Sequence, residues 1–548
     1  MFVENLPQWI LALAKFVPYH AGEGLPVLTR PQRIEAQKHG DQVNAAWEAV
    51  SSSNSCCEAV AKQLKDRVAF PEGKAYSQSV NSYWSLKEVE IHPSCVVLPE
   101  SADEVSQIVQ TLSAGMHVFK DQCQFAIRGA GHAPFAGASN IKNGVVIHLK
   151  NMPSAGLAPD HKTITVSPST TWDQVFATLD VFDLATLGGR VGGVGVGGLT
   201  TGCGISYFSP RFGFTCNMVE NFEVVLANGD IVNANATSHR PLWKALRGGS
   251  NNFGVVTAIT LRTFPQGKFW GGQTFHPIDT RKAHFHALEN LIASHPYDKY
   301  AHFINNLVTT NASYGNWFIG NSLQYTKSDP PSPFPETFKP FTDIPRAPLF
   351  PGAPDNTLRV DNHTAFTLEY AALSVYPKRW QFATISFGNS AEMMEDFFQL
   401  ANATIQPFIS LPGFLVSIAF QPLPTLISER YGAVDSLGPI QTQGNMFYIH
   451  WAMSVDGSEG STDAAFEQAT ETLFREAERK AAAKGLQRDF LQLTYADRWQ
   501  DPLGRRSKGT VKELWETSLL YDPHGLFQTQ VPGGFKLPQT KARENAEL

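Results

Sequence analysis

Short apolar runs alternate with amphipathic segments between residues 95 and 180. The runs at 95–98, 125–127, 145–149 and 163–166 predict short buried strands. Apolar residues recur at 105, 108, 109, 112 and 116, which places them on one face of a helix. Ser101 and Glu104 have the capping-box spacing at its start. Further helices are expected over 41–66 and 171–179, and the alternation favours a small α/β unit.

The next region carries turn signals. Residues 222–227 and 230–233 flank Asn228-Gly229, which predicts a two-residue β-hairpin. A short helix over 242–246 is expected to end at the following glycine pair, and a strand is expected over 254–261. After about residue 267 aromatic residues become frequent and glycine clusters end, so we predict a domain boundary there.

The second half of the chain has one strongly patterned strand and one long helix. In 445–451, Phe447, Ile449 and Trp451 fall on one face of a strand, and Met446, Tyr448 and His450 fall on the other. Residues 463–484 read as a helix that begins at Ser461 or Thr462 and ends at Gly485. Nine prolines within 328–355 predict a long irregular loop, which is either a cover for a pocket or a surface excursion.

Composition excludes several classes of protein. The chain has 548 residues, 43% of them hydrophobic and 17% charged, which excludes wholesale disorder. The net charge of −6 is well mixed, so we expect no nucleic-acid partner. No apolar run approaches the roughly 20 residues of a membrane span, so no stable span is expected. We find neither H-E-x-x-H nor paired C-x-x-C, and we expect no metal site.

The N-terminus and the cysteines bear on location. The apolar run at 9–14 is short for a signal-peptide core, and Glu4 stands where a positive charge is usual, so an intracellular location is slightly favoured. Six cysteines in this length exclude a disulfide-built scaffold. A bridge from Cys56 or Cys57 to Cys95 would favour a secretory route, and buried free thiols are the alternative.

Glycine is concentrated where a ligand would need close contact with the backbone. Nine of the seventeen residues at 188–204 are glycine, although glycine is costly in regular structure. Residues 193–198 satisfy the G-x-G-x-x-G pattern, but we do not expect the following L-T-T-G-C-G to continue a Rossmann helix. A second turn of small residues covers 128–139. Two such turns predict one extended dinucleotide held between them.

Five ordered segments together resemble a known family. They contain Y-W-S at 83–85, R-G-A-G-H at 128–132, V-G-V-G-G at 194–198, F-E-V-V-L-A-N-G at 222–229 with R-G-G-S-N-N-F-G at 247–254, and Y-D-P-H-G-L-F at 521–527. The chain resembles the FAD-linked oxidases of the vanillyl-alcohol oxidase and berberine-bridge-enzyme type, closest to fungal members that act in secondary metabolism. The resemblance covers most of residues 75–267 and 490–536.

The resemblance implies an α+β fold and four regions. We expect an N-terminal helical arm over 1–74, a two-lobed PCMH-type FAD-binding domain over 75–267 and a substrate domain over 268–489, with an antiparallel sheet covered by helices. Residues 490–548 are expected to return to the FAD domain. A monomer or weak homo-oligomer is expected.

The resemblance also implies how FAD is held. His132 is the expected point of a covalent bond to the flavin 8α-methyl carbon, and Ala130 replaces a usual glycine. Val191 stands where many relatives have a second linking cysteine, so a single link is expected. Val194 matches a position that leaves room for O₂. The full set of expected cofactor contacts is Arg128, Gly129, Ala130, Gly131, His132, Phe135, Gly137, Ser139, Gly192, Gly193, Val194, Gly197, Gly198, Gly202, Ile205, Val256 and Tyr495.

Expected catalytic residues are fewer. His450 titrates near neutral pH and could accept a substrate proton, with Tyr448 on the same strand face. Tyr495 ends Gln492-Leu-Thr-Tyr495, which departs from the family's Y-x-N-Y, and Asp497 follows it. Tyr207 is a weaker candidate. Each of these residues could instead be a structural core residue.

The implied reaction is hydride transfer from a small, largely apolar metabolite to FAD, with O₂ then reduced to H₂O₂. Alcohol oxidation and oxidative cyclisation both fit this description. A carbohydrate oxidase is one alternative, and a flavin-fold protein that guides a cyclisation without redox turnover is another.

Overall fold

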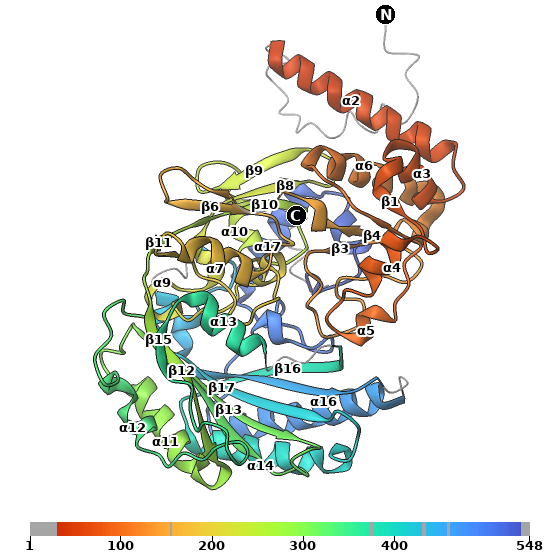
Figure 1. Ribbon diagram of the computed structural model, residues 1–548. Helices are drawn as coiled ribbons and strands as arrows, with labels where there is room; N and C mark the ends of the chain where they lie inside the picture. Colours follow the sequence, from red (N-terminus) through yellow and green to blue (C-terminus); the bar gives the residue numbers. More distant parts are fainter. Residues whose placement is uncertain (1–29, 154–155, 373–376, 430–433, 458–460, 539–548) are drawn as a thin grey trace, which may run out of the picture. The chain divides into compact units, whose positions relative to one another are not determined.

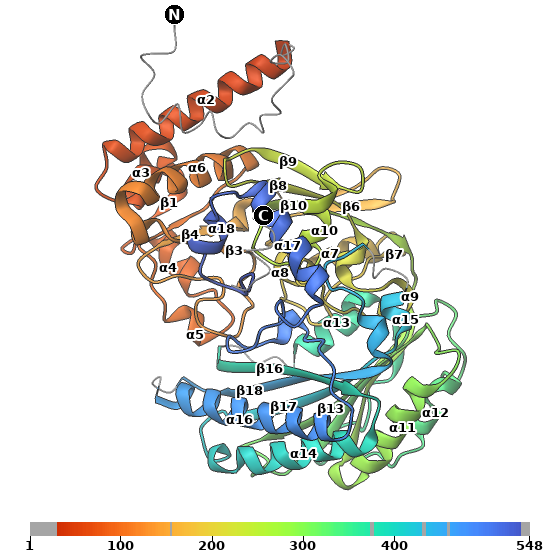
Figure 2. The ribbon, with the colours of Figure 1, turned by 180° about the vertical axis from the view of Figure 1, so that it is seen from behind.

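The computed structural model describes residues 30–153, 156–372, 377–429, 434–457 and 461–538 (Figures 1 and 2). The contacts divide the chain into two units, Met1–Ala45 and Ala46–Leu548. The boundaries expected at 74, 267 and 489 therefore stay predictions. The apolar run at 9–14 and Glu4 lie outside the described residues.

Residues 41–66, expected as one helix, form the end of one helix and the whole of another. Helix α2 (Arg30–Ser51) ends in a serine-rich turn, and α3 (Cys56–Gln63) begins after Ser55, whose side chain accepts from the backbone N–H of Glu58. Serine hydroxyls compete for helical carbonyls, and Ser52 and Ser53 bond back to the last turn of α2. The expectation of one continuous helix was wrong for this reason.

A four-stranded sheet and a five-stranded sheet form the first half of the larger unit. The four-stranded sheet has the order β1-β2-β4-β3 and consists of β1 (Val68–Ala69), β2 (Cys95–Val97), β3 (Phe125–Arg128) and β4 (Val145–His148). The five-stranded sheet has the order β5-β6-β10-β8-β9 and consists of β5 (Gly156–Leu157), β6 (Thr163–Val166), β8 (Val219–Val225), β9 (Ile231–Asn235) and β10 (Val255–Arg262). The predicted hairpin forms, with Val225 paired to Ile231, but its connection is longer than the predicted two residues. The Leu226 N–H donates to the Asp230 carbonyl, which leaves residues 227–229 as the turn.

Helices pack on these sheets and connect them. They are α4 (Lys74–Val80), α5 (Leu86–Val89), α6 (Ala102–Phe119), α7 (Trp172–Asp180), α8 (Val196–Thr201), α9 (Ser209–Phe212) and α10 (Arg240–Leu246). Ser101 caps α6 as predicted, by accepting from the N–H of Glu104, while the Glu104 carboxylate accepts from the N–H of Glu100. A small sheet pairs β7 (Leu184–Ala185) with β11 (Phe264–Pro265).

The third large sheet has seven strands in the order β15-β12-β14-β13-β17-β18-β16, and every paired neighbour is antiparallel. The strands are β12 (Phe269–Pro277), β13 (Ala301–Thr310), β14 (Phe318–Tyr325), β15 (Arg359–Asp361), β16 (Arg379–Gly388), β17 (Leu415–Leu423) and β18 (Met446–Val455). The mixed fold with an antiparallel, helix-covered sheet agrees with the expected α+β class.

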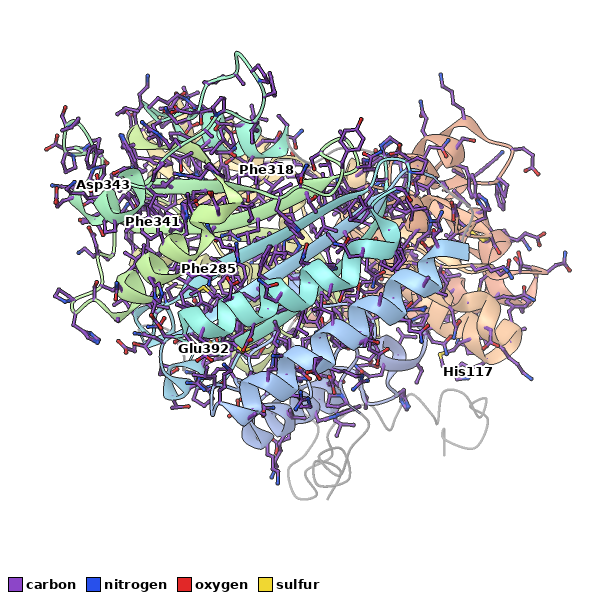
Figure 3. All side chains as sticks on the ribbon, turned by 90° about the horizontal axis from the view of Figure 1, so that it is seen from below. His117, Phe285, Phe318, Phe341, Asp343 and Glu392 are labelled. Carbon is purple, nitrogen blue, oxygen red and sulfur yellow. A yellow bond between two sulfur atoms is a disulfide. The ribbon has the colours of Figure 1, made fainter. Side chains whose placement is uncertain are left out.

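Helices cover one face of this sheet. They include α11 (Arg281–Ala293), α14 (Ala391–Ile405) and α16 (Ser461–Ala483), whose apolar residues share one core with the strands. Figure 3 shows the helix-covered face, with Phe285 of α11 and Glu392 of α14 labelled. Phe447, Ile449 and Trp451 of β18 lie in this core, which confirms the predicted alternation. The other face of the sheet is therefore available to line a site.

The remaining elements are α12 (Lys339–Thr342), α13 (His363–Ala371), α15 (Leu426–Glu429), α17 (Lys508–Tyr521) and α18 (Leu526–Thr529). The proline-rich segment is irregular apart from α12 and one adjoining 3₁₀ turn. The C-terminal segment with α17 and α18 lies beside β8 and β10 in both ribbon views. In the described part of the chain, no helix is both long and apolar enough to span a membrane.

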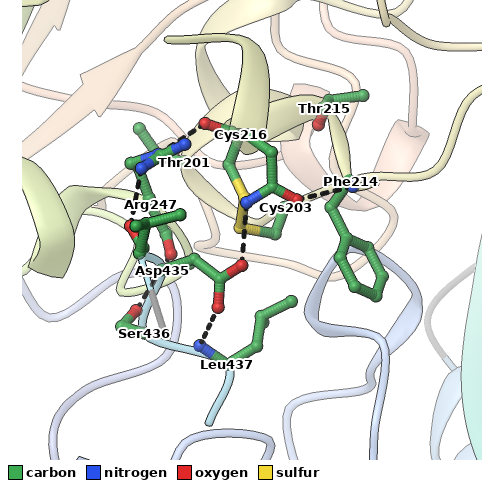
Figure 4. Close-up of a disulfide and its surroundings, with 12 residues drawn as sticks. Thr201, Cys203, Phe214, Thr215, Cys216, Arg247, Asp435, Ser436 and Leu437 are labelled. Carbon is green, nitrogen blue, oxygen red and sulfur yellow. Dashed lines mark hydrogen bonds between the residues drawn. A yellow bond between two sulfur atoms is a disulfide. The ribbon is translucent and has the colours of Figure 1, made fainter. Parts of the chain in front are cut away.

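All six cysteines are paired, so the alternative of buried free thiols was wrong. The bridges are Cys56–Cys123, Cys57–Cys95 and Cys203–Cys216. The last bridge ties the end of the glycine-rich segment to the turn before β8 (Figure 4). Beside it, the Arg247 Nε donates to the Cys216 carbonyl at 2.7 Å, and the Asp435 carboxylate accepts from the Asn217 amide at 2.8 Å.

Candidate active site

A cavity of about 570 Å³ is lined by both glycine-rich turns and by the helix-free face of the seven-stranded sheet. The sheet contributes alternate residues of its strands, as expected for side chains that point to one face. These lining residues are Gln273, Phe275, Ile304, Asn306, Val308, Thr310, Phe318, Gly320, Trp380, Phe382, Leu415, Ser417, Ala419, Gln421, His450 and Ala452. The volume is within the usual range for a small-molecule or cofactor site.

Hydrogen bonds from residues 83–88 hold the first glycine-rich turn, 128–139, in place. The Trp84 backbone N–H donates to the Gly131 carbonyl at 3.0 Å, and the Tyr83 hydroxyl donates to the Ser139 carbonyl at 2.8 Å. The buried Glu88 carboxylate accepts from the backbone N–H groups of Gly137 and Ser139 at 2.8 and 2.7 Å. These bonds explain why Y-W-S accompanies the glycine turn in the sequence.

Arg128 shapes this turn without lining the cavity. Its side chain is buried and donates to the Ser79 carbonyl at 2.6 Å and the Ser82 hydroxyl at 2.9 Å. Gly131 has a φ of +78°, and a Cβ there would lie 2.7 Å from the Arg128 Nε, so only glycine fits. Gly137 also lies away from the cavity lining.

His132 faces the cavity with a fixed ring. The ring stacks on Trp84 at a centroid distance of 4.2 Å and an interplanar angle of 15°. Burial lowers the pKa of His132 to about 4, so its imidazole is neutral at physiological pH. A neutral imidazole in a cavity is a competent nucleophile or hydrogen-bond acceptor.

The second turn packs directly against the first. A Cβ at Gly195 would lie 2.7 Å from the Ala130 Cβ, and a Cβ at Gly197 would lie 2.8 Å from Pro168. Gly198 lines the cavity, and a Cβ there would meet no atom within 4 Å. The turns therefore present backbone to the cavity, as the sequence predicted for a dinucleotide.

The glycine-rich segment differs from its predicted form in one respect. Val196–Thr201 forms helix α8, which ends at Gly202, so a helix does open after G-x-G. It has only six residues, and the segment lacks the long helix of a βαβ unit. Gly192 and Gly193 bond to Thr367 and Asp173, and neither they nor Gly202 line the cavity, unlike Ile205 and Val256.

Arg190 is a site residue that sequence reasoning missed. Its guanidinium donates from Nη1 to the His302 Nε2 at 3.0 Å and from Nη2 to the Tyr495 hydroxyl at 2.6 Å. The His302 Nδ1 donates to the Gln324 Oε1 at 3.2 Å, which leaves Nε2 as the acceptor. The available signal was a charged residue within a run of glycines. Its partners, on β13 and in the C-terminal segment, could not be read from that run.

His450 and Tyr495 both line the cavity, with their rings side by side. Their rings stack at a centroid distance of 4.1 Å, and Phe382 packs edge-on against His450 at 4.4 Å. Burial and the charge of Arg190 lower the pKa of His450 to about 3. Its Nε2 is buried and has no hydrogen-bond partner among the described residues. The neutral His450 ring therefore lines the cavity beside Tyr495, and the expectation that it titrates near neutral pH was wrong because the ring is buried.

The other expected residues surround the cavity without lining it. The Tyr448 hydroxyl donates to the Gln421 Oε1 at 2.7 Å, so Tyr448 orients a lining residue. The Tyr207 hydroxyl donates to the Arg190 carbonyl at 3.2 Å. The Gln492 amide donates to the Cys203 carbonyl at 3.2 Å, and Asp497, whose pKa burial raises to about 6, accepts from the Trp499 Nε1 at 3.1 Å.

Comparisons with known proteins agree with this geometry. Residues 93–235 match a family described as FAD binding domain. FAD-dependent monooxygenase CTB5 of Cercospora beticola is 58% identical over 92% of this chain and 96% of its own length. FAD-dependent monooxygenase elcE of Phaeosphaeria nodorum is 82% identical over 61% of this chain and 98% of its own length. The chain belongs to the same family of FAD-dependent enzymes as these two proteins.

Solved structures of berberine-bridge-enzyme-like proteins and oligosaccharide oxidases share the fold at low identity. BBE-like 1 of Physcomitrella patens has a TM-score of 0.69 and 15% identity, covering 90% of this chain and 99% of that one. Xylooligosaccharide oxidase of Myceliophthora thermophila has a TM-score of 0.68 and 16% identity, covering 89% and 100%. At this identity the likeness concerns the fold alone.

The residues present fit the family's cofactor. Two turns bring bare backbone to one wall, and the phenyl rings of Phe135 and Phe535, 5.6 Å apart, meet edge to face beside the first turn. The lining is largely apolar toward the sheet, which suits a flat aromatic ring system. As a member of this family, the protein is an FAD-dependent oxidoreductase.

Proposed function

We propose that the protein is an oxidase that removes hydride from a C–H bond of a small, largely apolar secondary metabolite. The electrons then pass to O₂, which takes up two electrons and two protons to give H₂O₂. The observation that supports this most strongly is one cavity with the neutral His132 on its cofactor side and an apolar sheet face opposite. FAD, when bound, supplies the hydride acceptor.

The proposal includes a single covalent tether at His132. The stack on Trp84 holds the imidazole in one orientation, and its lowered pKa leaves a ring nitrogen unprotonated. Val191 lines the same cavity and has no nucleophilic atom, which supports one link rather than two. Arg128, Glu88 and Tyr83 act indirectly, by holding the turn that carries His132.

His450 and Tyr495 handle the substrate's proton. A ring nitrogen of His450, whose neutral imidazole lines the cavity, accepts a proton from the substrate O–H as hydride leaves the adjacent carbon. The Tyr495 hydroxyl, held by Arg190, orients the substrate beside that nitrogen. Tyr448 positions Gln421.

Oxygen use is supported by Val194. It lines the cavity with a small side chain at the position that the family resemblance assigns to O₂ access. At the next residue, Gly195 packs so closely on Ala130 that a larger side chain would not fit there.

A monooxygenase is the second candidate, because the curated relatives carry that name. It would place one atom of O₂ in the product and need an external reductant. An oligosaccharide oxidase is less well supported, because saccharides need many polar contacts and this lining is mostly apolar. A non-redox cyclase would bind FAD without turning it over.

One experiment separates these functions. The purified holoprotein is screened for O₂ uptake with aromatic and polyketide-like alcohols and with oligosaccharides, and active substrates are repeated under ¹⁸O₂. An oxidase gives one H₂O₂ for each oxidised product and no ¹⁸O in that product. Incorporated ¹⁸O with a requirement for reductant would establish a monooxygenase. Flavin that no substrate bleaches under anaerobic conditions would overturn the redox role.

A further inference from the structure

Arg190 is the only formally charged side chain among the described residues that line the cavity. It is 7% exposed, and no described carboxylate lies within ion-pair distance of it. The two lining histidines, His132 and His450, have pKa values lowered to about 4 and 3 and are neutral. The cavity therefore carries one buried positive charge and no negative charge of its own.

The nearby polar groups cannot serve as a counter-ion. Burial lowers the pKa of His302 well below its ordinary value and raises the pKa values of Tyr207, Tyr370 and Tyr448, so these four groups are neutral. A guanidinium has five N–H donors. His302 and Tyr495 take two, and Tyr448 can take a third. At least two donors are not taken by these three partners, and Arg190 lines the cavity.

A buried unpaired charge is costly, and proteins normally pair such charges or hydrogen-bond them fully. The partners that orient Arg190 are His302 on β13 and Tyr495 in the C-terminal segment, and Asn306 of β13 bonds to the hydroxyl of Tyr370 close by at 2.8 Å. Three of these four residues, Asn306, Tyr370 and Tyr495, line the cavity. The guanidinium is therefore held at the part of the cavity that is lined by the seven-stranded sheet.

We propose that Arg190 forms an anion-binding subsite for an acidic oxygen of the substrate, either a carboxylate or a phenol or enol that ionises on binding. The inference rests on the proposed function, and it narrows the substrate class to apolar metabolites with one acidic group. Tyr495 shares the subsite, and the His302–Gln324 pair fixes the direction of the guanidinium. The subsite would anchor the substrate at one end.

The test measures binding of small probes to the full-length purified protein by isothermal titration calorimetry. One pair is 4-phenylbenzoate with its neutral amide, 4-phenylbenzamide, and the other is 4-phenylphenol with 4-methoxybiphenyl. The first pair reports a carboxylate site, and the second reports a phenol site. We expect one acidic probe to bind about tenfold to a hundredfold more tightly than its neutral partner, as charged hydrogen bonds allow.

Three variants complete the test. Arg190→Met should reduce the preference to less than about threefold, and Arg190→Lys should retain part of it because lysine keeps the charge but not the fork. Arg498→Met removes an exposed arginine paired with Glu467, away from the cavity, and should leave the preference unchanged. If Arg190→Met does not fold, the Arg190→Lys variant decides the test. Lysine cannot make the two parallel hydrogen bonds of a guanidinium. A preference for the acidic probe that is unchanged in Arg190→Lys would therefore count against the subsite.

The contradicting results are distinct from failure of the proposed function. No preference for either acid in the wild type, or a preference that survives in Arg190→Met, would overturn the subsite. A lowered flavin reduction potential in Arg190→Met with an unchanged probe preference would assign the cation to the cofactor instead. A protein that binds no flavin but keeps the preference would overturn only the proposed function.

Discussion

The two walls of the cavity are built in different ways. The cofactor wall consists largely of backbone from two glycine-rich turns, with His132 and Phe135 of the first turn facing the cavity. Arg128 and Glu88 hold the first turn from behind the lining. The substrate wall consists of alternate side chains on antiparallel strands. The first wall recognises what all members of the family bind, whereas the second can change residue by residue without disturbing the fold. We therefore expect substrate specificity to depend mainly on the sheet, together with Arg190 and Tyr495 at its border.

The largest effect is expected where a tyrosine hydroxyl lines the cavity rather than lying behind the lining. Tyr495→Phe removes a hydroxyl that lines the cavity and bonds to Arg190, while the ring can still stack on His450. We expect the anaerobic rate of flavin reduction by the substrate to fall by about a hundredfold or more. Stopped-flow absorbance measures this rate.

Tyr448→Phe is the matched control. It removes a hydroxyl bonded to Gln421, behind the lining, and should lower the same rate by less than about tenfold. If both variants lost the same fraction of the flavin reduction rate, then lining the cavity would not distinguish Tyr495 from Tyr448.

The free energy of unfolding tests how the first turn of the cofactor wall is supported. Glu88→Ala leaves the N–H groups of Gly137 and Ser139 without their acceptor, so we expect the free energy of unfolding to fall by about 2–3 kcal/mol. Urea unfolding of the holoprotein measures the change. Glu90→Ala, two residues away, removes an exposed carboxylate paired with Arg379 and should cost less than about 1 kcal/mol. A Glu88→Ala protein as stable as the wild type would show that the turn needs no such support.

The sequence predicted the cofactor wall better than the substrate wall for a physical reason. Glycine positions such as Gly131 and Gly195 are dictated by local backbone geometry, which leaves a direct trace in the sequence. The alternation that placed His450 on the cavity face of β18 is also local. Arg190 meeting His302 depends on how a loop and a strand more than a hundred residues apart pack together.

Other misses have the same origin. The predicted bridge to Cys95 is confirmed, with Cys57 as its partner. The bridge from Cys56 to Cys123 was missed, because it follows from α3 packing on α6, which no spacing reveals. Leu349, in the proline-rich segment, lines the cavity. Part of that segment therefore covers the site, which was one of the two interpretations of its proline content. Helix α8 passes so close to Pro168 that Gly197 leaves no space for a side chain, and this contact could not be read from the sequence.

The pH dependence of flavin attachment sharpens the account of His132. Because burial lowers the pKa of His132 to about 4, its imidazole stays neutral above that pH. Attachment of added FAD to protein produced without riboflavin should therefore be independent of pH from 6 to 8 and fall to half near about pH 4. Gel fluorescence over time measures the rate. A half-point near 6.5, the value of an ordinary histidine, would mean that the ring is exposed before attachment.

The smallest effect is expected at the edge of the substrate wall. Leu349 lines the cavity but is 40% exposed, so Leu349→Ala should raise the KM for the substrate by about three- to tenfold. Phe350→Ala, at an exposed neighbour that does not line the cavity, should leave the KM unchanged. Steady-state O₂ uptake measures both, and a larger effect at Phe350 would remove Leu349 from the site.

The central claim is that His132 holds a single FAD covalently between the two glycine-rich turns. The most direct measurement is to denature the purified protein in acid, digest it, and map the flavin-bearing peptide by mass spectrometry. The account predicts yellow colour that stays with the polypeptide, one flavin mass on the peptide with His132, and none in His132→Ala. Flavin released freely from the wild type, or attached to a different residue, would contradict it.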